Sequence, residues 1–392
     1  MMTTDNLCVI IPSYNTLGHL KNTYNSVRKY YPTVEVIMID DASEDGTSEW
    51  MRSLVDDNLK CWYGEERLGH TFYYDEGVRQ AGKDVITILH SDMIVGPNYF
   101  ENMLKHMEPG IVVCSTRVEP PIHPAAKEKI VMDFGTDYDD FQWDAFEKFC
   151  LETQGVEKDR VTSGIFAPWM LYKTDYLAIG GHDQGFAPYG YEDSDIFNRW
   201  ILQGYNMVQS RDALVYHLTC RGHRWNKGVG IENDDYKETM DRGQRHFIRK
   251  WNQWIQNDDY SMPIIYPKYD TCLVLENVSD INLLYQIEPW ANHVHVDNES
   301  LLEKYIISEQ PRTKIDLRKR ITIGDYDYLT NHDVIVKLDC NKITQDDFQN
   351  VVRINLILHD IEQELNVMGD YELGNITVSI KQLRNIVKEL IQ

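Results

Sequence analysis

Asp92, Asp41 and Tyr14 each stand close to the point where a short apolar run gives way to polar residues. Asp92 follows the run 85–89, which is typical of a strand buried in a parallel sheet. A carboxylate at that point can hold a divalent cation that bridges two phosphates, because hard cations prefer oxygen ligands. Asp41 can accept from the N3–H of a uracil-like base, and Tyr14 can stack on that ring. The alternative for Asp92 is a turn residue in the loop before Pro97.

Apolar runs and helical patterns alternate along the first part of the chain. The expected strands are 7–11, 34–39, 59–63 and 85–89, and the helices between them are 17–30, 47–54 and 69–81. This alternation is typical of a parallel sheet with helices on its faces. Because ligands bind beyond the carboxyl ends of parallel strands, the polar loops should meet at one edge. The sequence therefore predicts an α/β fold with a nucleoside-diphosphate site at that edge.

The composition disfavours several classes of protein. The 62 acidic and 39 basic side chains give a net charge of −23, which disfavours nucleic-acid binding and broad attachment to anionic membranes. The seven cysteines include no CxxC pair, so neither a disulfide framework nor a zinc site is indicated. No apolar run approaches a transmembrane span, and the start MMTTDNL lacks the basic flank of a signal peptide. We therefore expect a cytoplasmic protein, and its 392 residues predict two domains.

Five sequence blocks occur in the order and spacing of a known family. They are CVIIPSYN, VIMIDDASEDGT, ERLGHTFYYDEGVRQAGKDVITILHSD, SGIFAPWMLYKTDYLAIGGHDQGFAPYGYEDSDIFNRW and VYHLTCRGHRW. In these blocks, within residues 7–225, the chain resembles the family-two inverting glycosyltransferases, which have the GT-A fold. The resemblance implies a nucleotide-sugar donor, a hydroxyl acceptor and a Mn²⁺ or Mg²⁺ cofactor. It says nothing about the chain beyond about residue 265.

The resemblance also implies roles for individual residues. Asp41 matches the acidic residue that reads the base, and Asp92 matches the last carboxylate of the DxD motif, which binds the metal with the diphosphate. Asp193 matches the catalytic base, and Glu192 matches the neighbour that supports the acceptor or orients the loop. His217 matches a further contact to the metal or the diphosphate. The residues expected to bind the nucleotide are Pro12, Ser13, Tyr14, Asn15, Asp41, Gly69 and Ser91.

Two blocks depart from the family pattern. His90 replaces the first carboxylate of the DxD motif, and Tyr73–Asp75 replaces the usual Ala-Arg-Asn. These departures favour a rival prediction, a catalytically weak nucleotide-sugar-binding protein on the same fold. A second rival, a sugar nucleotidyltransferase, would need a glycine-rich loop with an arginine after the first strand. The sequence PSYNTLG is not such a loop.

Asp193 suits the chemistry that the family implies. An acceptor hydroxyl must lose its proton as it attacks the anomeric carbon, so a carboxylate base must lie within reach. Asp193 opens an expected helix, where an Asp is also a good N-cap, and Asp195 or Ser194 could serve as base instead. One base with direct displacement implies inversion at the anomeric carbon. His217 ends the apolar run ALVYHL and could be a structural histidine rather than a ligand.

Several further residues could contact the acceptor or close over the donor. Segment 221–230 is basic and glycine-rich, so it is either a lid or a solvated loop. Its cations that could clamp the diphosphate are Arg221, His223, Arg224 and Lys227. Trp169 and Tyr189 could form an acceptor platform or belong to the core. The proline-rich insertion 117–159, with a short helix at 143–151, is expected to contact the acceptor.

The C-terminal part carries no recognised catalytic motif. An expected helix at 236–255 has basic and aromatic side chains, and it either lies on a membrane or packs against its own domain. The expected division is a catalytic domain 1–256, a linker 257–268 and a small α/β unit 269–392 that ends in a helix at 378–391. Homo-oligomer formation, partner docking and acceptor positioning are the open roles for this unit.

The sequence as a whole predicts an inverting, metal-dependent glycosyltransferase. The expected donor is a nucleotide sugar, and UDP is the first expectation for its nucleotide. The expected acceptor is a hydroxyl group of a growing glycan, with lipid-linked and protein acceptors as alternatives, as in polysaccharide biosynthesis.

Overall fold

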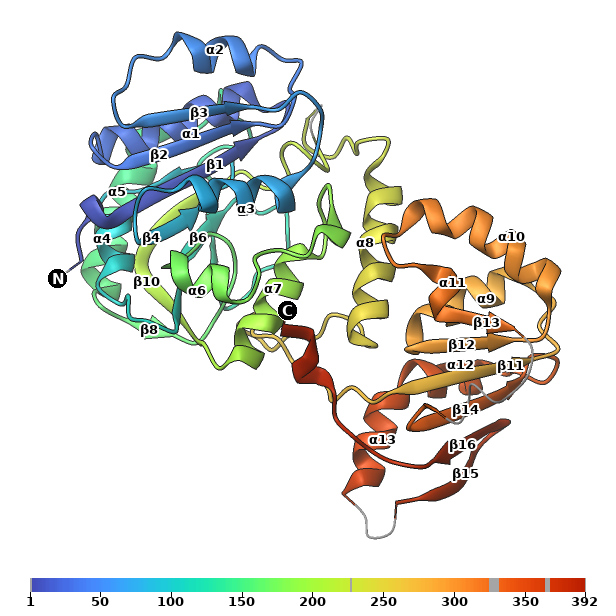
Figure 1. Ribbon diagram of the computed structural model, residues 1–392. Helices are drawn as coiled ribbons and strands as arrows, with labels where there is room; N and C mark the ends of the chain where they lie inside the picture. Colours follow the sequence, from blue (N-terminus) through green and yellow to red (C-terminus); the bar gives the residue numbers. More distant parts are fainter. Residues whose placement is uncertain (1, 226–227, 324–330, 364–366, 392) are drawn as a thin grey trace. The chain divides into compact units, whose positions relative to one another are not determined.

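The chain folds into two compact units. The computed structural model describes residues 2–225, 228–323, 331–363 and 367–391 (Figure 1). Unit 1 comprises Met1–Met240 and Asn257–Pro263, and unit 2 comprises Asp241–Gln256 and Ile264–Gln392. The sequence-based division ended the first domain at residue 256, whereas segment 241–256 groups with unit 2 in the structure.

Unit 1 contains the strands and helices that the N-terminal pattern predicts. Its strands are β1 (Leu7–Ser13), β2 (Glu35–Asp40), β3 (Leu59–Tyr63), β4 (Val85–Ile88), β5 (Met93–Val95), β6 (Ile111–Glu119), β7 (Lys129–Val131), β8 (Val161–Thr162), β9 (Trp169–Tyr172) and β10 (Asn206–His217). Its helices are α1 (Leu17–Tyr30), α2 (Thr47–Ser53), α3 (His70–Gln80), α4 (Tyr99–Leu104), α5 (Trp143–Glu157), α6 (Lys173–Ala178) and α7 (Glu192–Gln203). Helix α5 extends to Glu157, beyond the predicted 143–151.

The sheet of unit 1 is mixed, with strand order β3-β2-β1-β4-β9-β6-β10-β5. Strands β3, β2, β1 and β4 are parallel, as the alternation of strand and helix predicts. Strands β9 and β5 run antiparallel to their neighbours. The α/β prediction is confirmed, and the loops after β1, β2 and β4 leave the sheet at the same edge because these strands are parallel.

Helices cover both faces of the parallel strands. Val9 and Ile11 of β1 pack in one buried cluster with Leu20 of α1. Ile10 points to the opposite face, because side chains alternate along a strand. A Cβ atom added at Gly77 of α3 would lie 2.5 Å from Cγ2 of Ile10. A glycine is therefore needed for α3 to approach β1 this closely (Figure 1).

Unit 2 is a second α/β unit, as predicted. Its strands, β11 (Thr271–Glu276), β12 (His293–Val296), β13 (Ile321–Ile323), β14 (Val334–Asp339), β15 (Gly369–Leu373) and β16 (Ile376–Ile380), have the order β13-β12-β11-β14-β16-β15. Its helices are α9 (Ile281–Ile287), α10 (Glu299–Glu309), α11 (Leu317–Arg320), α12 (Gln345–Val352) and α13 (Ile354–Glu362). The predicted helix at 378–391 is wrong. Strand β16 pairs with β14 and buries Val378, and only Val387–Ile391 forms a 3₁₀ turn.

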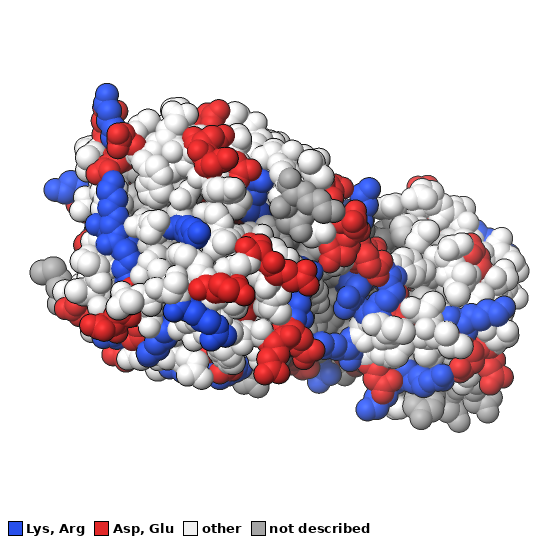
Figure 2. Space-filling view, turned by 90° about the horizontal axis from the view of Figure 1, so that it is seen from above, with Lys and Arg blue, Asp and Glu red and all other residues white. Residues whose placement is uncertain are grey.

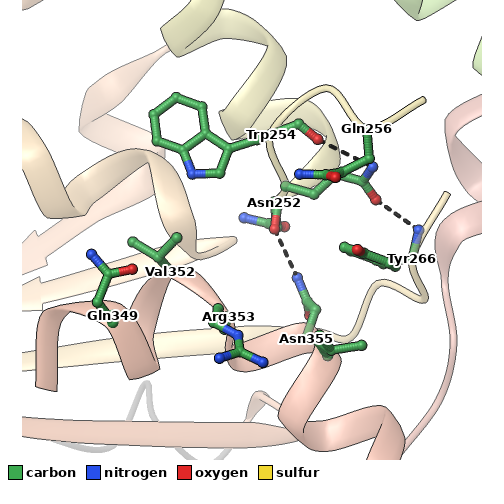
Figure 3. A pocket seen from close by; sticks show the side chains of 10 residues that line it. Asn252, Trp254, Gln256, Tyr266, Gln349, Val352, Arg353 and Asn355 are labelled. Carbon is green, nitrogen blue, oxygen red and sulfur yellow. Dashed lines mark hydrogen bonds between the residues drawn. The ribbon is translucent and has the colours of Figure 1, made fainter. Parts of the chain in front are cut away.

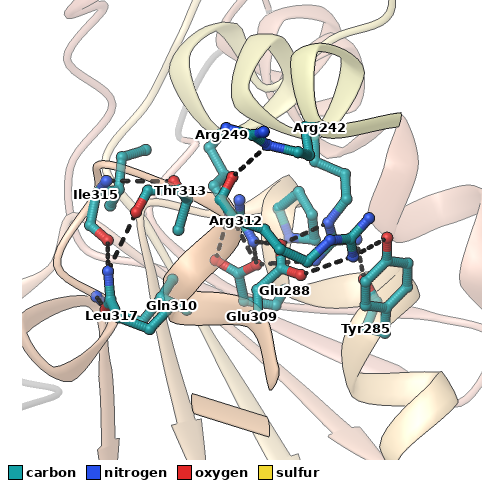
Figure 4. Close-up of polar contacts among 12 residues, drawn as sticks. Arg242, Arg249, Tyr285, Glu288, Glu309, Gln310, Arg312, Thr313, Ile315 and Leu317 are labelled. Atoms are coloured by element: carbon teal, nitrogen blue, oxygen red, sulfur yellow. Dashed lines mark hydrogen bonds and ion pairs between the residues drawn. The ribbon is translucent and has the colours of Figure 1, made fainter. Parts of the chain in front are cut away.

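Helix α8 (Tyr236–Trp251) is tied to unit 2 from Asp241 onward through buried ion pairs (Figure 4). Arg249 donates to Glu288 at 2.8 Å and to Glu309 at 2.5 Å, and Arg245 donates to Glu309 at 2.8 Å. Burial opposes ionisation of Glu288, but Arg249 and Arg320 lower its pKa to about 2. Removal of one partner would leave a buried charge, which costs about 3–5 kcal/mol. Arg245 and Arg249 of this helix therefore serve packing within unit 2.

The charged surface fits the acidic composition. Figure 2 shows Asp and Glu side chains gathered in patches beside Lys and Arg on the face that it draws. In the part of the chain that the structure describes, no helix has the length and apolar character that a membrane crossing requires.

Candidate active site

The site forms around Asp92, which lies in the turn between β4 and β5 and is 4% exposed. Strand β5 pairs antiparallel with the end of β10, which brings Met93 opposite His217. The Leu218 N–H donates to the Asp92 carbonyl at 3.0 Å. The Arg221 N–H donates to the Asp92 carboxylate at 3.1 Å. These contacts fix the carboxylate at the edge of the sheet.

His90, Asp92 and His217 could hold a metal ion. One ligand atom from each lies within 4.8 Å of the others, and His217 Nε2 lies 3.6 Å from Asp92 Oδ1. Two imidazole nitrogens and a carboxylate oxygen suit Mn²⁺ or a later transition metal better than Mg²⁺, which prefers oxygen ligands. Burial lowers the pKa of His90 to about 3, so this ring keeps the neutral form that binds metals. The donor set therefore fits a divalent transition-metal cofactor.

Glu119, the last residue of β6, orients His217. Its Oε1 lies 2.8 Å from His217 Nδ1, so the Nδ1–H donates to Glu119 and Nε2 is left for a ligand. Arg117 and Lys129 each pair with Glu119 at 2.7 Å. Burial opposes ionisation of Glu119, but His217 and Arg117 hold its pKa well below the usual range. Burial likewise opposes ionisation of Asp92, and His217 and His90 hold its pKa below the ordinary value.

Hydroxyl groups connect the end of β1 to the turn that carries Asp92. Thr16 Oγ1 lies 2.8 Å from Ser13 Oγ and 2.9 Å from Ser91 Oγ. The predicted nucleotide residues Ser13 and Ser91 therefore share Thr16 as a neighbour. Sequence reasoning missed Thr16, because its partner Ser91 is 75 residues away along the chain.

Pro12 and Asn15 lie at the same edge. Pro12 is in β1, opposite Ile39 of β2. Asn15 has a φ of +51°, its N–H donates to Ser43 Oγ at 2.8 Å, and its Oδ1 accepts from the Glu44 N–H at 2.8 Å. Asn15 thereby joins the loops that follow β1 and β2.

Asp41 supports the loop that precedes α3. Its carboxylate accepts the N–H groups of Leu68 at 2.7 Å and Gly69 at 3.0 Å, and its own N–H donates to the Ser13 carbonyl at 2.9 Å. Burial raises the pKa of Asp41 to about 6. A carboxylate has about four acceptor positions, so these two bonds leave room for a base N–H.

Tyr14 lies beneath the guanidinium of Arg67, which is 4.0 Å from the ring centroid. Arg67 also pairs with Asp235 at 3.3 Å and lies 5.5 Å from the centroid of Tyr189. One face of the Tyr14 ring is therefore covered by a cation. Sequence reasoning missed Arg67, although it stands in the quoted block that begins ERLGH.

Gly69 lets the loop before α3 meet the loop before α7. Its φ is +90°, and an added Cβ atom would lie 2.2 Å from Pro188 Cα. The next residue, His70, donates its N–H to the Pro188 carbonyl at 2.8 Å. Both the left-handed backbone and the close approach require a glycine here.

Asp193 lies in the first turn of α7 and is half-buried. Burial and the negative charge of Glu192 raise the pKa of Asp193 to about 7. A carboxylate with a pKa near the working pH is well suited to accept a proton in catalysis. The alternative base Asp195 is buried and accepts from Arg199 at 2.8 Å, so its carboxylate is occupied by an ion pair.

His70 connects the start of α7 to the three candidate metal ligands His90, Asp92 and His217, here called the metal-ligand cluster. Its Nδ1 lies 3.9 Å from Glu192 Oε1, and its ring centroid lies 6.3 Å from that of His90. Burial opposes ionisation of Glu192, but His70 holds its pKa below the ordinary value. Sequence reasoning missed His70, because a histidine after a glycine at a helix start has no fixed role.

Comparison with known proteins identifies the fold family. Residues 8–156 match the sequence model of glycosyl transferase family 2. Residues 157–220 match the model described as the N-terminal domain of galactosyltransferase. Residues 8–156 are a glycosyltransferase family 2 domain. The predicted family is thereby confirmed for residues 8–156, and the sheets of the structure confirm the predicted α/β fold class.

Relatives of the family 2 domain are distant. Validoxylamine A glucosyltransferase of Streptomyces hygroscopicus subsp. jinggangensis is 26% identical over 53% of this chain and 54% of that protein. Undecaprenyl-phosphate mannosyltransferase of Micrococcus luteus is 28% identical over 28% of this chain and 48% of that protein. The chain thus spans about half the length of these relatives. A solved structure of GalNAc-T7 with UDP, GalNAc and Mn²⁺ aligns with a TM-score of 0.43 and 14% identity, over 62% of this chain and 48% of that chain.

The two predicted platform aromatics of unit 1 occupy different surroundings. Trp169 is 1% exposed and packs edge-on against Trp200 at 4.9 Å, so its ring belongs to the core and is closed to an acceptor. Tyr189 is 3% exposed, but its ring lies 6.3 Å from His70 and 5.4 Å from His223. Tyr189 therefore stands beside the site, and Trp169 does not.

The cations of the predicted lid are held by neighbours. Arg221 pairs with Asp137 at 3.2 Å and donates to the Thr136 carbonyl. Arg224 pairs with Glu232 at 2.8 Å. Lys227 lies outside the described residues, and burial lowers the pKa of His223 to about 4. The two guanidinium groups thus bind loop residues, while the backbone N–H of Arg221 donates to the Asp92 carboxylate.

The block Tyr73–Asp75 has a structural role in the family 2 domain. The carboxylate of Asp75 accepts from Tyr176 Oη at 2.5 Å and from the His182 N–H at 2.9 Å. The ring of Tyr74 lies parallel to that of His90, with centroids 6.3 Å apart. The altered block therefore supports the loop before α7 and the metal-ligand cluster.

Proposed function

We propose that this chain is an inverting glycosyltransferase that moves a sugar from a nucleotide sugar to a hydroxyl group of a glycan. UDP is the nucleotide we propose, Asp193 the general base, and unit 1 the catalytic part. The observation that carries the proposal is the contact chain from Glu192 through His70 to His90, which joins the start of α7 to the metal-ligand cluster.

The donor side of this proposal rests on the end of the sheet. His90, Asp92 and His217 would hold a divalent cation, and Glu119 would keep His217 Nε2 directed to it. When bound, the cation would neutralise charge on the leaving diphosphate. Asp41 would accept from the uracil N3–H, and the Tyr14 ring would pack on the base.

The acceptor side rests on α7. The oxygen of the acceptor hydroxyl would bond to the anomeric carbon while the bond from that carbon to the diphosphate breaks. The Asp193 carboxylate would take the proton that the hydroxyl loses. Displacement in one step from the opposite face inverts that carbon. Glu192 would keep Asp193 basic, because its negative charge favours the protonated form of its neighbour.

A donor panel tests the proposal. Purified protein is incubated with UDP-, GDP- and TDP-sugars, Mn²⁺ and oligosaccharide acceptors, and nucleotide release and the anomeric configuration of the product are measured. We expect release with UDP-sugars and an inverted product. Asp193→Asn should lose at least about 10³-fold in kcat while its Kd for UDP stays within two-fold of the wild type. Retention of configuration, or a large loss of UDP affinity in this variant, would contradict the mechanism.

A further inference from the structure

Unit 2 contains a hollow that no step of the proposed reaction uses. It lies between the end of α8 and the junction of α12 and α13 (Figure 3). Its lining residues are Asn252, Gln253, Trp254, Gln256, Tyr266, Gln349, Val352, Arg353, Asn355 and Leu356. All of them belong to unit 2, so the hollow is a property of that unit alone.

Backbone geometry creates the hollow. Helix α8 ends at Trp251, and Asn252 follows with a left-handed φ of +51°. Helices α12 and α13 break at Arg353. The Asn355 Nδ2 donates to the Asn252 carbonyl at 3.5 Å, which joins the two elements. Gln253 fixes the segment that follows, because its Oε1 accepts from the Tyr266 N–H at 2.7 Å.

The lining combines an aromatic face with amide groups. Trp254 is 42% exposed, and its ring is braced edge-on by Trp290 at 4.9 Å. Side-chain amides come from both walls, and each offers donors as well as an acceptor. A sugar ring presents the same combination, because its C–H faces are apolar and its hydroxyl groups both donate and accept.

Two polar groups of the hollow lack a partner within the described residues. Asn252 is 3% exposed, and its Oδ1 is buried without a hydrogen bond there. A buried acceptor without a partner costs free energy, so a ligand hydroxyl that donates to it would gain affinity. Arg353 is exposed at the rim, and no carboxylate in the described ranges pairs with its guanidinium. Its fork of N–H groups can bind two neighbouring hydroxyl oxygens or a sugar carboxylate.

We propose that this hollow is a saccharide-binding site in which Trp254 packs against a sugar ring and Asn252, Gln349 and Arg353 bond its oxygen atoms. That the saccharide is part of the acceptor glycan rests on the proposed function. Saccharide binding itself does not, since the hollow uses no residue of unit 1. The site would hold a long acceptor glycan while the end of that glycan reacts at the catalytic site of unit 1. Unit 2 would then need no catalytic centre of its own.

The test measures binding of the full-length protein to immobilised oligosaccharides of glucose, of N-acetylglucosamine and of galacturonic acid. We expect at least one to bind, with Trp254→Ala and Arg353→Ala each weakening it about ten-fold or more. Trp254→Phe, which keeps an aromatic face, should retain more affinity than Trp254→Ala. Ile307→Ala is the matched control, because Ile307 is an exposed apolar residue of unit 2 (72% exposed) outside the hollow.

A second comparison separates this site from the catalytic one. Asp193→Asn and saturating UDP should leave saccharide binding unchanged, whether or not the protein proves to be a transferase. The inference fails if no oligosaccharide of the three classes binds. It also fails if folded Trp254→Ala, Trp254→Phe and Arg353→Ala proteins all bind as the wild type does, or if UDP displaces the saccharide.

Discussion

His217 Nδ1 lies 2.8 Å from Glu119 Oε1, while the other nitrogen of the same ring lies 3.6 Å from the Asp92 carboxylate. A carboxylate behind a histidine fixes the tautomer and direction of the ring, which metal sites commonly require. The two partners are 98 residues apart in the chain and meet because β10 is parallel to β6.

Removal of the Glu119 charge should weaken the metal site. In Glu119→Gln we expect affinity for Mn²⁺ to fall about 10- to 100-fold, because the His217 ring loses its ionic support. Isothermal titration with Mn²⁺ measures the effect. The matched control is Glu128→Gln, since Glu128 also pairs with Arg117, at 2.9 Å, but is not the partner of His217. Equal losses in both variants would assign the effect to the Arg117 network instead.

A carboxylate at position 90 should change the preference among metals. His90→Asp replaces an imidazole nitrogen by an oxygen ligand, so the ratio of Mg²⁺-supported to Mn²⁺-supported nucleotide binding should rise. Thermal-shift titrations of UDP with each ion would show it. His106→Asp serves as the control for a new carboxylate away from the Asp92 turn. An unchanged ratio in His90→Asp would remove this residue from the ligand set.

The transferase activity should increase with pH through the neutral range. The base must be ionised, and burial together with Glu192 raises the pKa of Asp193 to about 7. Below that value kcat/KM should fall about ten-fold per pH unit, and above it the rate should level off. Glu192→Gln removes a like charge, so the rise should move to lower pH. A profile that stays in place in this variant would show that another group titrates.

Two glycine substitutions should separate backbone strain from a steric clash. Gly69 and Gly110 both have positive φ, +90° and +76°, but only at Gly69 would a Cβ meet another atom, Pro188 Cα at 2.2 Å. Gly110→Ala should cost about 1–2 kcal/mol of unfolding free energy for the left-handed backbone. Gly69→Ala should cost about 1–3 kcal/mol more and also weaken UDP binding. Urea denaturation and UDP titration measure both quantities, and equal costs would argue against a tight contact at Pro188.

Much of the N-terminal fold follows from local patterns. Apolar runs that end in polar residues predicted β1 to β4, and the loops after them hold Tyr14, Asp41 and Asp92 as expected. Parallel strands make this inference possible, because their carboxyl ends share one edge. The C-terminal run around Val378 misled the prediction, because a short apolar segment fits a helix or a strand, and its pairing with β14 decides which forms.

The sequence by itself determined the family blocks, the α/β class and the carboxylates available for chemistry. Only the tertiary structure decided which partners they have: Glu119 behind His217, Arg67 over Tyr14, and His70 between Glu192 and His90. It also assigned Trp169 to the core and Arg221 to the loop of Asp137. The reason is physical. A strand or helix depends on residues close in sequence, whereas the pKa and orientation of a side chain depend on groups that packing brings from distant parts of the chain.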